Sequence, residues 1–171
     1  AVLEMDAVLA EHKNHWFVGE AVGLLRRTFN RLDVSSRSLI ALIEQGSCFS
    51  GTFLELALAC DRSYMLALPD DAAKAPKITV GELNFGTYPM ATNQSRIGRR
   101  FYDEAPAIDP IRAKVGQQLD ADQALQLGLV TSSPDDIDWQ DETRIAIEER
   151  VAMSPDSLTG LEASLRFNGV E

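Results

Sequence analysis

The sequence contains few cysteines and histidines, which limits the chemistry it could support. Its two cysteines, Cys48 and Cys60, cannot form a disulfide framework or a cysteine-based metal site. Both lie in an apolar stretch, which predicts buried free thiols and fits a reducing cytoplasm. The two histidines, His12 and His15, lie three residues apart on one face of a predicted helix. Because no third ligand is near them, surface histidines are favoured over a metal site.

Positive charge is also scarce. The 16 lysines and arginines are outnumbered by 26 aspartates and glutamates, which leaves a net charge of −10 at pH 7. This charge disfavours binding to nucleic acid or to an anionic membrane surface, although a local site could still hold an anionic small molecule. No apolar run approaches the about 20 residues of a membrane-spanning helix. We therefore expect one globular domain over residues 1–171.

The most informative pattern lies between residues 39 and 61. Residues 39–43 are an unbroken apolar run, typical of a strand buried on both faces. Residues 45–51 form a connection bounded by glycine, and residues 52–60 are predicted to form a helix that is apolar on every side and hence buried. Glu55 is the one carboxylate in its first turn. A helix N-terminus, a hidden partner or a catalytic role would each explain that acid.

Strands and helices alternate through the rest of the chain. We expect helices at 1–32 (with a break near Asn14), 94–102, 121–127, 140–153 and from Pro155, strands at 39–43, 62–68, 77–85 and 129–132, an exposed loop at 69–76 and an irregular segment with two prolines at 105–114. Asp120 and Gln123 match a capping box at the start of the helix at 121–127. This order predicts an α/β domain with a mostly parallel sheet and helices at both ends.

Two acids in apolar surroundings, Glu55 and Glu82, are candidates for general acid–base chemistry. If the fold brings them together, one could stay protonated and act as the acid while the other acts as the base. Gly51, just before the helix, could offer its backbone N–H to a developing oxyanion. The alternative is that each acid caps a helix or pairs with an arginine.

A cationic cluster lies in the predicted helix at 94–102. It consists of Arg96, Arg99 and Arg100. These arginines could hold an anionic ligand, or they could pair with carboxylates of the chain itself. The excess of acids favours pairing within the chain.

Three segments resemble the motifs of one enzyme superfamily, and they occur in the same order. They read GSCFSGTFLELALACD at 46–61, GELNFGTYP at 81–89 and LDADQALQLGLV at 119–130. Together they resemble the glycine-rich turn and buried helix, the second acidic segment and the capped helix of the crotonase (enoyl-CoA hydratase/isomerase) superfamily. The resemblance implies a crotonase-like spiral of ββα units, incomplete at its N-terminus, with helices at the C-terminal end.

The resemblance also implies roles for particular residues. It places Glu55 and Glu82 at the positions of the two catalytic glutamates, and Gly51 and Thr52 at the oxyanion turn that binds the substrate. It implies no metal and no cofactor, because CoA arrives as part of the acyl-CoA substrate. The turn lacks the family's consecutive glycines, since bulky Phe53 stands beside Thr52.

The resemblance is strongest to lyases of this superfamily that act on benzoyl-CoA derivatives, and there it covers only the second half of a longer protein. It implies that water opens an epoxidised or dihydrodiol benzoyl-CoA ring and that carbon is released as formate. We therefore expect a fragment of a cytoplasmic two-half protein that associates with the missing N-terminal half and forms homo-oligomers. The alternative is a non-catalytic crotonase-like half that packs against a catalytic half or mediates assembly, with Glu55 neutralised by Arg96 or Arg99.

Overall fold

A parallel strand pair lies at the centre of the fold. The computed structural model describes residues 1–167. Strand β1 (Ile40–Ile43) pairs with β2 (Arg62–Met65), so that Ile40 lies opposite Arg62 and Ile43 opposite Met65. The chain passes from β1 to β2 through the 3₁₀ turn η1 (Gly51–Phe53) and helix α3 (Leu54–Leu58). The strand, turn and buried helix predicted for residues 39–61 are therefore confirmed. The strand, however, is fully buried on one face only.

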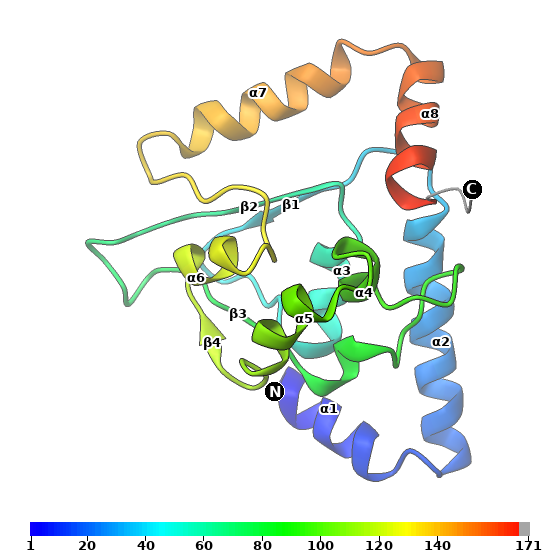
Figure 1. Ribbon diagram of the computed structural model, residues 1–171. Coiled ribbons are helices and arrows are strands. Elements are labelled where there is room, and N and C mark those ends of the chain that lie inside the picture. Colours follow the sequence, from blue (N-terminus) through cyan, green and yellow to red (C-terminus); the bar gives the residue numbers. More distant parts are fainter. Residues whose placement is uncertain (168–171) are drawn as a thin grey trace.

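Two helices precede this unit. Helix α1 (Val2–Glu11) contacts η1, and the long helix α2 (Trp16–Asp33) runs along one side of the molecule (Figure 1). The helical structure is interrupted between them, near Asn14, as predicted. His15 is the N-cap of α2, and its Nδ1 accepts the N–H of Phe17 at 3.2 Å. The ring thus has a local structural task at the start of that helix.

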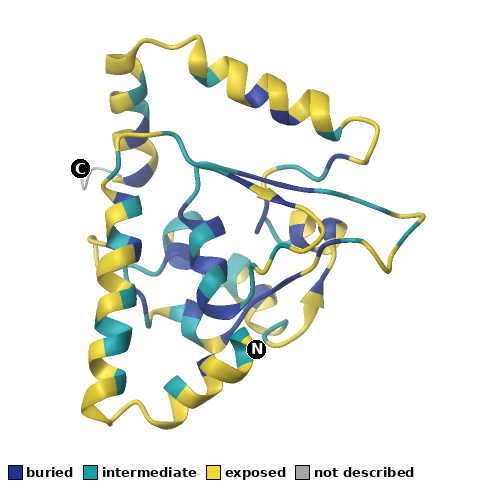
Figure 2. Cartoon of the chain, turned by 180° about the vertical axis from the view of Figure 1, so that it is seen from behind, coloured by how far each residue is buried: buried dark blue, intermediate teal, exposed yellow. Residues whose placement is uncertain are grey.

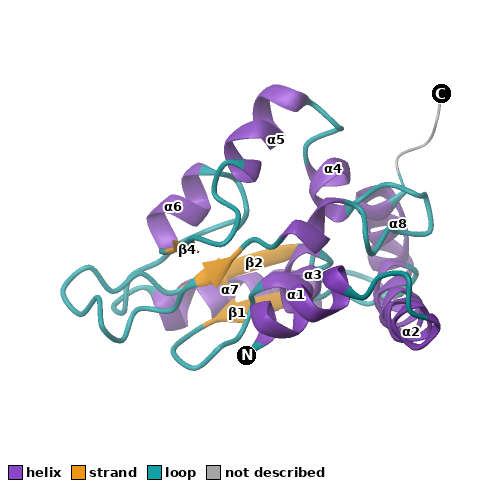
Figure 3. Cartoon of the chain, turned by 90° about the horizontal axis from the view of Figure 1, so that it is seen from below, coloured by secondary structure: helices purple, strands orange, loops and turns teal. Residues whose placement is uncertain are grey.

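The remaining elements follow β2. They are β3 (Ile78–Thr79), the 3₁₀ turn η2 (Glu82–Phe85), α4 (Arg96–Arg100), α5 (Ala105–Arg112), β4 (Gln118–Leu119), α6 (Ala121–Gln126), α7 (Trp139–Val151) and α8 (Pro155–Arg166). Strands β3 and β4 form a second, antiparallel pair. The predicted capping box is present, because Asp120 accepts the N–H of Gln123 and Gln123 accepts that of Asp120. Figure 3 shows β1 and β2 side by side, with α2 and α8 at one end of the molecule.

The hydrophobic core lies between the strands and the short helices. Its members are almost wholly enclosed, and they include Ile43, Leu54, Met65, Ile78, Val80, Ile97, Ile111, Leu119 and Ala124. Figure 2 shows these buried segments at the centre of the chain, whereas α7 and the outer side of α2 are exposed along most of their length. The core therefore holds α3 and α4, which carry Glu55 and Arg96, in a fixed relation.

Several expectations about burial were wrong. Leu42 in β1 is 39% exposed, because α7 leaves an open pocket beside it that Trp139 and Ile147 also line. Cys48 is exposed, since it lies in the turn after β1 and not in the buried helix. Three apolar side chains of α7, Ile145, Ile147 and Val151, are also exposed, and the side that this helix buries carries small residues.

Two predictions of secondary structure also need correction. Residues 105–114 are mostly helical rather than irregular: Pro106 lies in the first turn of α5, where a missing N–H costs nothing, and Pro110 is tolerated near the end of the helix. The strand predicted at 77–85 is only two residues long and gives way to η2. Residues 129–132 contribute a single parallel bridge, from Ser132 to Tyr64. Within residues 1–167 the two sheets are accordingly small, and one of them is parallel.

Candidate functional site

The glycine turn before α3 is closed by a side chain from α1. Gly51 has φ of +50°, a left-handed conformation that favours glycine. The Thr52 N–H donates to Oδ2 of Asp6 at 2.8 Å, and the Thr52 hydroxyl donates to Oδ1 at 2.5 Å. Asp6 is 6% exposed. Its carboxylate therefore caps the N-terminal end of η1 and α3, where a negative charge is stabilised.

The structure thus places both predicted oxyanion residues at the start of the buried helix, but the Thr52 N–H already has an acceptor. The same hydroxyl of Thr52 lies 3.0 Å from the Tyr88 hydroxyl, which acts as the donor because the hydrogen of Thr52 goes to Asp6. Sequence reasoning missed Asp6. It lies 46 residues before Thr52, and no local pattern connects an acid in one helix with a turn so far along the chain.

Glu55 lies one turn further into the same unit and is 1% exposed. Its Oε1 accepts the side-chain amide of Asn84 at 2.7 Å, and its Oε2 accepts Nη1 of Arg96 at 2.8 Å. Burial raises the pKa of Glu55, while the charge of Arg96 and the hydrogen bonds from Asn84 and Arg96 oppose that rise. Both carboxylate oxygens are therefore engaged within the protein.

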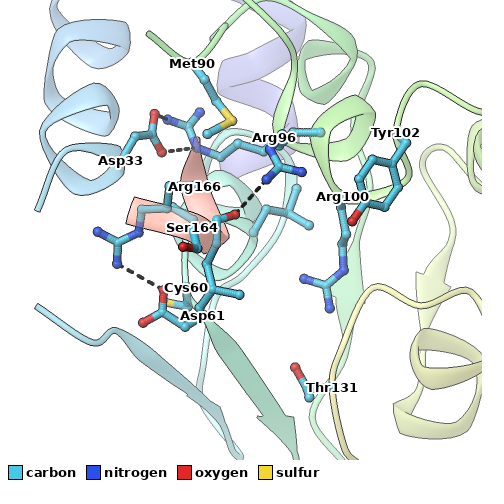
Figure 4. A pocket seen from close by; sticks show the side chains of 14 residues that line it. Asp33, Cys60, Asp61, Met90, Arg96, Arg100, Tyr102, Thr131, Ser164 and Arg166 are labelled. Atoms are coloured by element: carbon cyan, nitrogen blue, oxygen red, sulfur yellow. Dashed lines mark hydrogen bonds and ion pairs between the residues drawn. The ribbon is translucent and has the colours of Figure 1, made fainter. Parts of the chain in front are cut away.

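Arg96 joins two buried carboxylates. Its Nη2 is 2.6 Å from Oδ2 of Asp33 at the end of α2, and its Nε donates to Oδ1 of Asp33 at 3.2 Å (Figure 4). Its Nη1 also donates to the Tyr88 carbonyl at 3.0 Å. Burial raises the pKa of Asp33 against the opposing charge of Arg96. The expectation that Arg96 pairs with the chain's own carboxylates and neutralises Glu55 is confirmed.

The second predicted acid lies elsewhere. Glu82 begins η2 and is exposed, so its carboxylate faces water while Glu55 is enclosed. Two residues further along the turn, Asn84 is buried and points inward. Its Nδ2 also donates to the Gly51 carbonyl at 2.9 Å, and its Oδ1 accepts the N–H of Gly81. The group that η2 brings to Glu55 is therefore the side-chain amide of Asn84 and not the carboxylate of Glu82. The catalytic roles of Glu55 and Glu82 and the oxyanion roles of Gly51 and Thr52 stay predictions.

A second buried ion network anchors the C-terminal helix. Arg166 in α8 contacts Asp61 at 3.0 Å and Glu162 at 2.9 Å, and it also donates to the carbonyls of Leu32, Ser35 and Arg37. Oε1 of Glu162 accepts the Ser38 hydroxyl at 2.6 Å. Through these contacts α8 is attached to the segment that leads into β1.

This network predicts a pH dependence of stability. Burial raises the pKa of Glu162 from its ordinary value of 4.5, and hydrogen bonding to Asp61 adds to the rise. A raised carboxyl pKa favours folding while the group is protonated, and this contribution is lost as the pH rises above 4.5. We expect Glu162→Gln, which cannot ionise, to gain stability relative to the unmodified chain between about pH 4.5 and pH 7.

The measurement is urea denaturation of both proteins across that range. The exposed Glu149, which pairs with Arg62 at the surface, provides the control variant Glu149→Gln, which should change the free energy of unfolding by at most about 1 kcal/mol. If the difference in the free energy of unfolding between Glu162→Gln and the unmodified chain does not change with pH, the pKa of Glu162 does not contribute to stability as proposed.

The described part of the chain also bears on metals and membranes. No cluster of three or more histidine, cysteine, aspartate or glutamate side chains within residues 1–167 is placed to hold a metal ion. No helix in the same residues has the length and apolar character that crossing a bilayer requires.

Burial raises the pKa of the Cys60 thiol to about 11, so this cysteine is protonated near neutral pH.

Comparison with known structures identifies the fold. An enoyl-CoA hydratase/carnithine racemase from Magnetospirillum magneticum superimposes with a TM-score of 0.65 and 23% identity, over 89% of this chain and 53% of the other. An enoyl-CoA hydratase from Bacillus halodurans gives 0.64 and 16%, over 87% and 55%. The chain has the crotonase fold. The crotonase-like α/β fold predicted from the three sequence motifs is thereby confirmed, and the spiral of ββα units stays a prediction. No family model matches the sequence.

One curated relative is much more similar in sequence to this crotonase-fold chain. The benzoyl-CoA-dihydrodiol lyase of Aromatoleum evansii is 57% identical over 171 residues, which is 99% of this chain. The chain spans only 30% of the length of that lyase. It also spans about half of each solved structure named above.

Proposed function

We propose that this chain is a non-catalytic crotonase-like unit of a CoA-thioester lyase of the benzoyl-CoA-dihydrodiol type. The 57% identity to that lyase supports the assignment of the longer protein. In the reaction that we propose for it, water opens an epoxidised or dihydrodiol benzoyl-CoA ring and carbon leaves as formate. The role of the present unit is to pack against the catalytic part of the lyase and support its assembly.

The observation that carries this proposal is the Asp6 carboxylate on the N–H of Thr52. An oxyanion site needs donors that are aimed at a position which the reacting oxygen can occupy. Here a carboxylate already fills that position, and its negative charge would repel a developing oxyanion. The side chain of Phe53 follows directly, where the related motif has glycine.

The state of Glu55 supports the same conclusion. A general base must come within hydrogen-bonding distance of the proton that it removes. Glu55 is enclosed, and Asn84 and Arg96 hold its two oxygens. An enclosed carboxylate with both oxygens held by fixed donors is suited to maintaining the packing of η1, η2 and α4 against one another.

A kinetic experiment on the full-length lyase tests the proposal. We expect Glu82→Gln to leave the rate of formate release within about twofold, because an exposed acid outside the reaction centre makes no contribution of the 10²–10⁴-fold size typical of general acids and bases. Glu20→Gln, a change at another exposed acid, is the control. The epoxide of benzoyl-CoA and the dihydrodiol of benzoyl-CoA are the two substrates to compare.

The rate of formate release is also measured for Glu55→Gln, and the melting temperature is recorded for every variant. We expect a lower melting temperature and a rate per folded enzyme that is unchanged. A loss of about 10²-fold or more in either variant, at an unchanged melting temperature, would assign the chemistry to Glu55 and Glu82 and overturn the non-catalytic proposal.

A further inference from the structure

A cluster of arginines in this acidic chain surrounds one cavity. The cavity has a volume of about 420 Å³ and lies between the C-terminal end of α3, helix α4 and helix α8. Four arginines line it: Arg96, Arg99, Arg100 and Arg166 (Figure 4). It shares Arg96 and Asp33 with the network around Glu55, while Gly51, Thr52 and Glu55 do not line it.

Two of these arginines are neutralised by carboxylates. Arg96 pairs with Asp33 and Glu55, and Arg166 pairs with Asp61 and Glu162. The four acids are thus committed to two of the four cations.

Arg100 differs from those two. Its Nε donates to the Gly128 carbonyl at 2.6 Å, and within residues 1–167 no carboxylate forms an ion pair with it. Burial lowers the pKa of Arg100 and no nearby acid opposes that effect. Figure 4 shows its guanidinium directed along the cavity toward Thr131, which leaves its terminal N–H groups facing the enclosed space. A half-buried cation without a counter-charge is unfavourable, and a bound anion would relieve it.

The neighbouring groups determine which anion fits. Arg99 also lines this wall, and its Nη2 donates to the Leu165 carbonyl at 2.9 Å. The Thr131 hydroxyl accepts the N–H of Ser63, which leaves its own hydrogen to donate. Donors that approach from α4 and from the segment after α6 suit an anion with several oxygens in a tetrahedral arrangement. A guanidinium offers two parallel N–H groups to such oxygens.

We propose that this cavity binds a phosphate dianion, either inorganic phosphate or the phosphate group of a larger ligand. The volume of about 420 Å³ exceeds that of one phosphate, so a phosphate ester can enter with part of its organic group. The net charge of −10 gives the protein no general attraction for anions, so binding depends on the local arginines. This proposal does not depend on whether the unit is catalytic.

Isothermal titration calorimetry at 150 mM NaCl, with inorganic phosphate and with CoA as separate probes, tests the proposal. We expect saturable binding of phosphate, and Arg100→Gln should weaken it by about tenfold or more, since a bidentate charge-assisted contact is lost. Arg112→Gln is the matched control, because Arg112 stacks on Phe85 and does not line the cavity. It should bind as the unmodified chain does.

The two probes separate the possible sources of the phosphate group. Binding of CoA that also depends on Arg100 assigns the cavity to a phosphorylated organic ligand, whereas binding of phosphate alone assigns it to a small anion. If Arg100→Gln fails to fold, Arg100→Lys retains the charge without the two-pronged donor and should show an intermediate affinity. Absence of binding to the unmodified chain, or equal binding by Arg100→Gln, would overturn the proposal.

Discussion

Replacing Arg96 with methionine will lower the free energy of unfolding by about 3–5 kcal/mol, the cost of leaving buried charges without their partner. Arg96 is 2% exposed, and it is the only arginine within residues 1–167 that bridges Asp33 and Glu55. Methionine has a similar length but cannot donate hydrogen bonds, so both carboxylates would lose their counter-charge. Their pKa values, already raised by burial, would rise further.

Urea denaturation, with the midpoint and slope both recorded, measures this effect. Arg112→Met is the control, because Arg112 lies on the surface of α5 with its guanidinium 4.1 Å from the Phe85 ring centroid. We expect it to cost at most about 1 kcal/mol. Combining Arg96→Met with Asp33→Asn and Glu55→Gln should recover much of the stability, since no buried charge then remains unpaired. A loss below about 1 kcal/mol in Arg96→Met would show that the network contributes little.

Replacing Gly51 with alanine will cost at least about 3 kcal/mol, because two penalties act together. The positive φ of +50° is strained for alanine by about 1–2 kcal/mol. The added Cβ would also overlap the Asp6 carboxylate and lie 3.0 Å from Cδ2 of Leu3. Asp6 would have to move and give up its hydrogen bonds to Thr52, which carry charge and contribute about 1.5–3 kcal/mol.

The control isolates the backbone penalty. Gly116 has φ of +77° and no atom within 4 Å of the position that a Cβ would take. Gly116→Ala should therefore cost only about 1–2 kcal/mol. In a chain that already carries Asp6→Ala, we expect Gly51→Ala to cost only slightly more than Gly116→Ala, because the overlap with Asp6 is gone and only the close contact with Cδ2 of Leu3 remains. Equal costs at Gly51 and Gly116 in the unmodified chain would contradict the proposed role of Asp6.

The local elements were predicted well wherever a signal lies within a few residues. The strand, turn and helix between residues 39 and 61, the capping box at Asp120 and the helix start at Pro155 all depend on neighbouring side chains. The prediction for residues 105–114 was wrong because the position of a proline within a helix decides its cost, and the start of α5 was not recognised. Burial of Leu42 and Cys48 was wrong because apolar composition does not show what covers a given face.

The segment around Glu55 also separates what the sequence determined from what depended on tertiary packing. The sequence alone determined that Glu55 lies in a buried helix and that a glycine turn precedes it, because these features follow from the local pattern of residues. Its resemblance to crotonase motifs indicated the fold. Only the tertiary structure decided which groups meet there. It brought Asp6, Asn84 and Arg96 to the turn and to Glu55, and left Glu82 exposed. Contacts between residues 29 to 46 positions apart depend on how helices and turns pack, and no local pattern of residues encodes that packing.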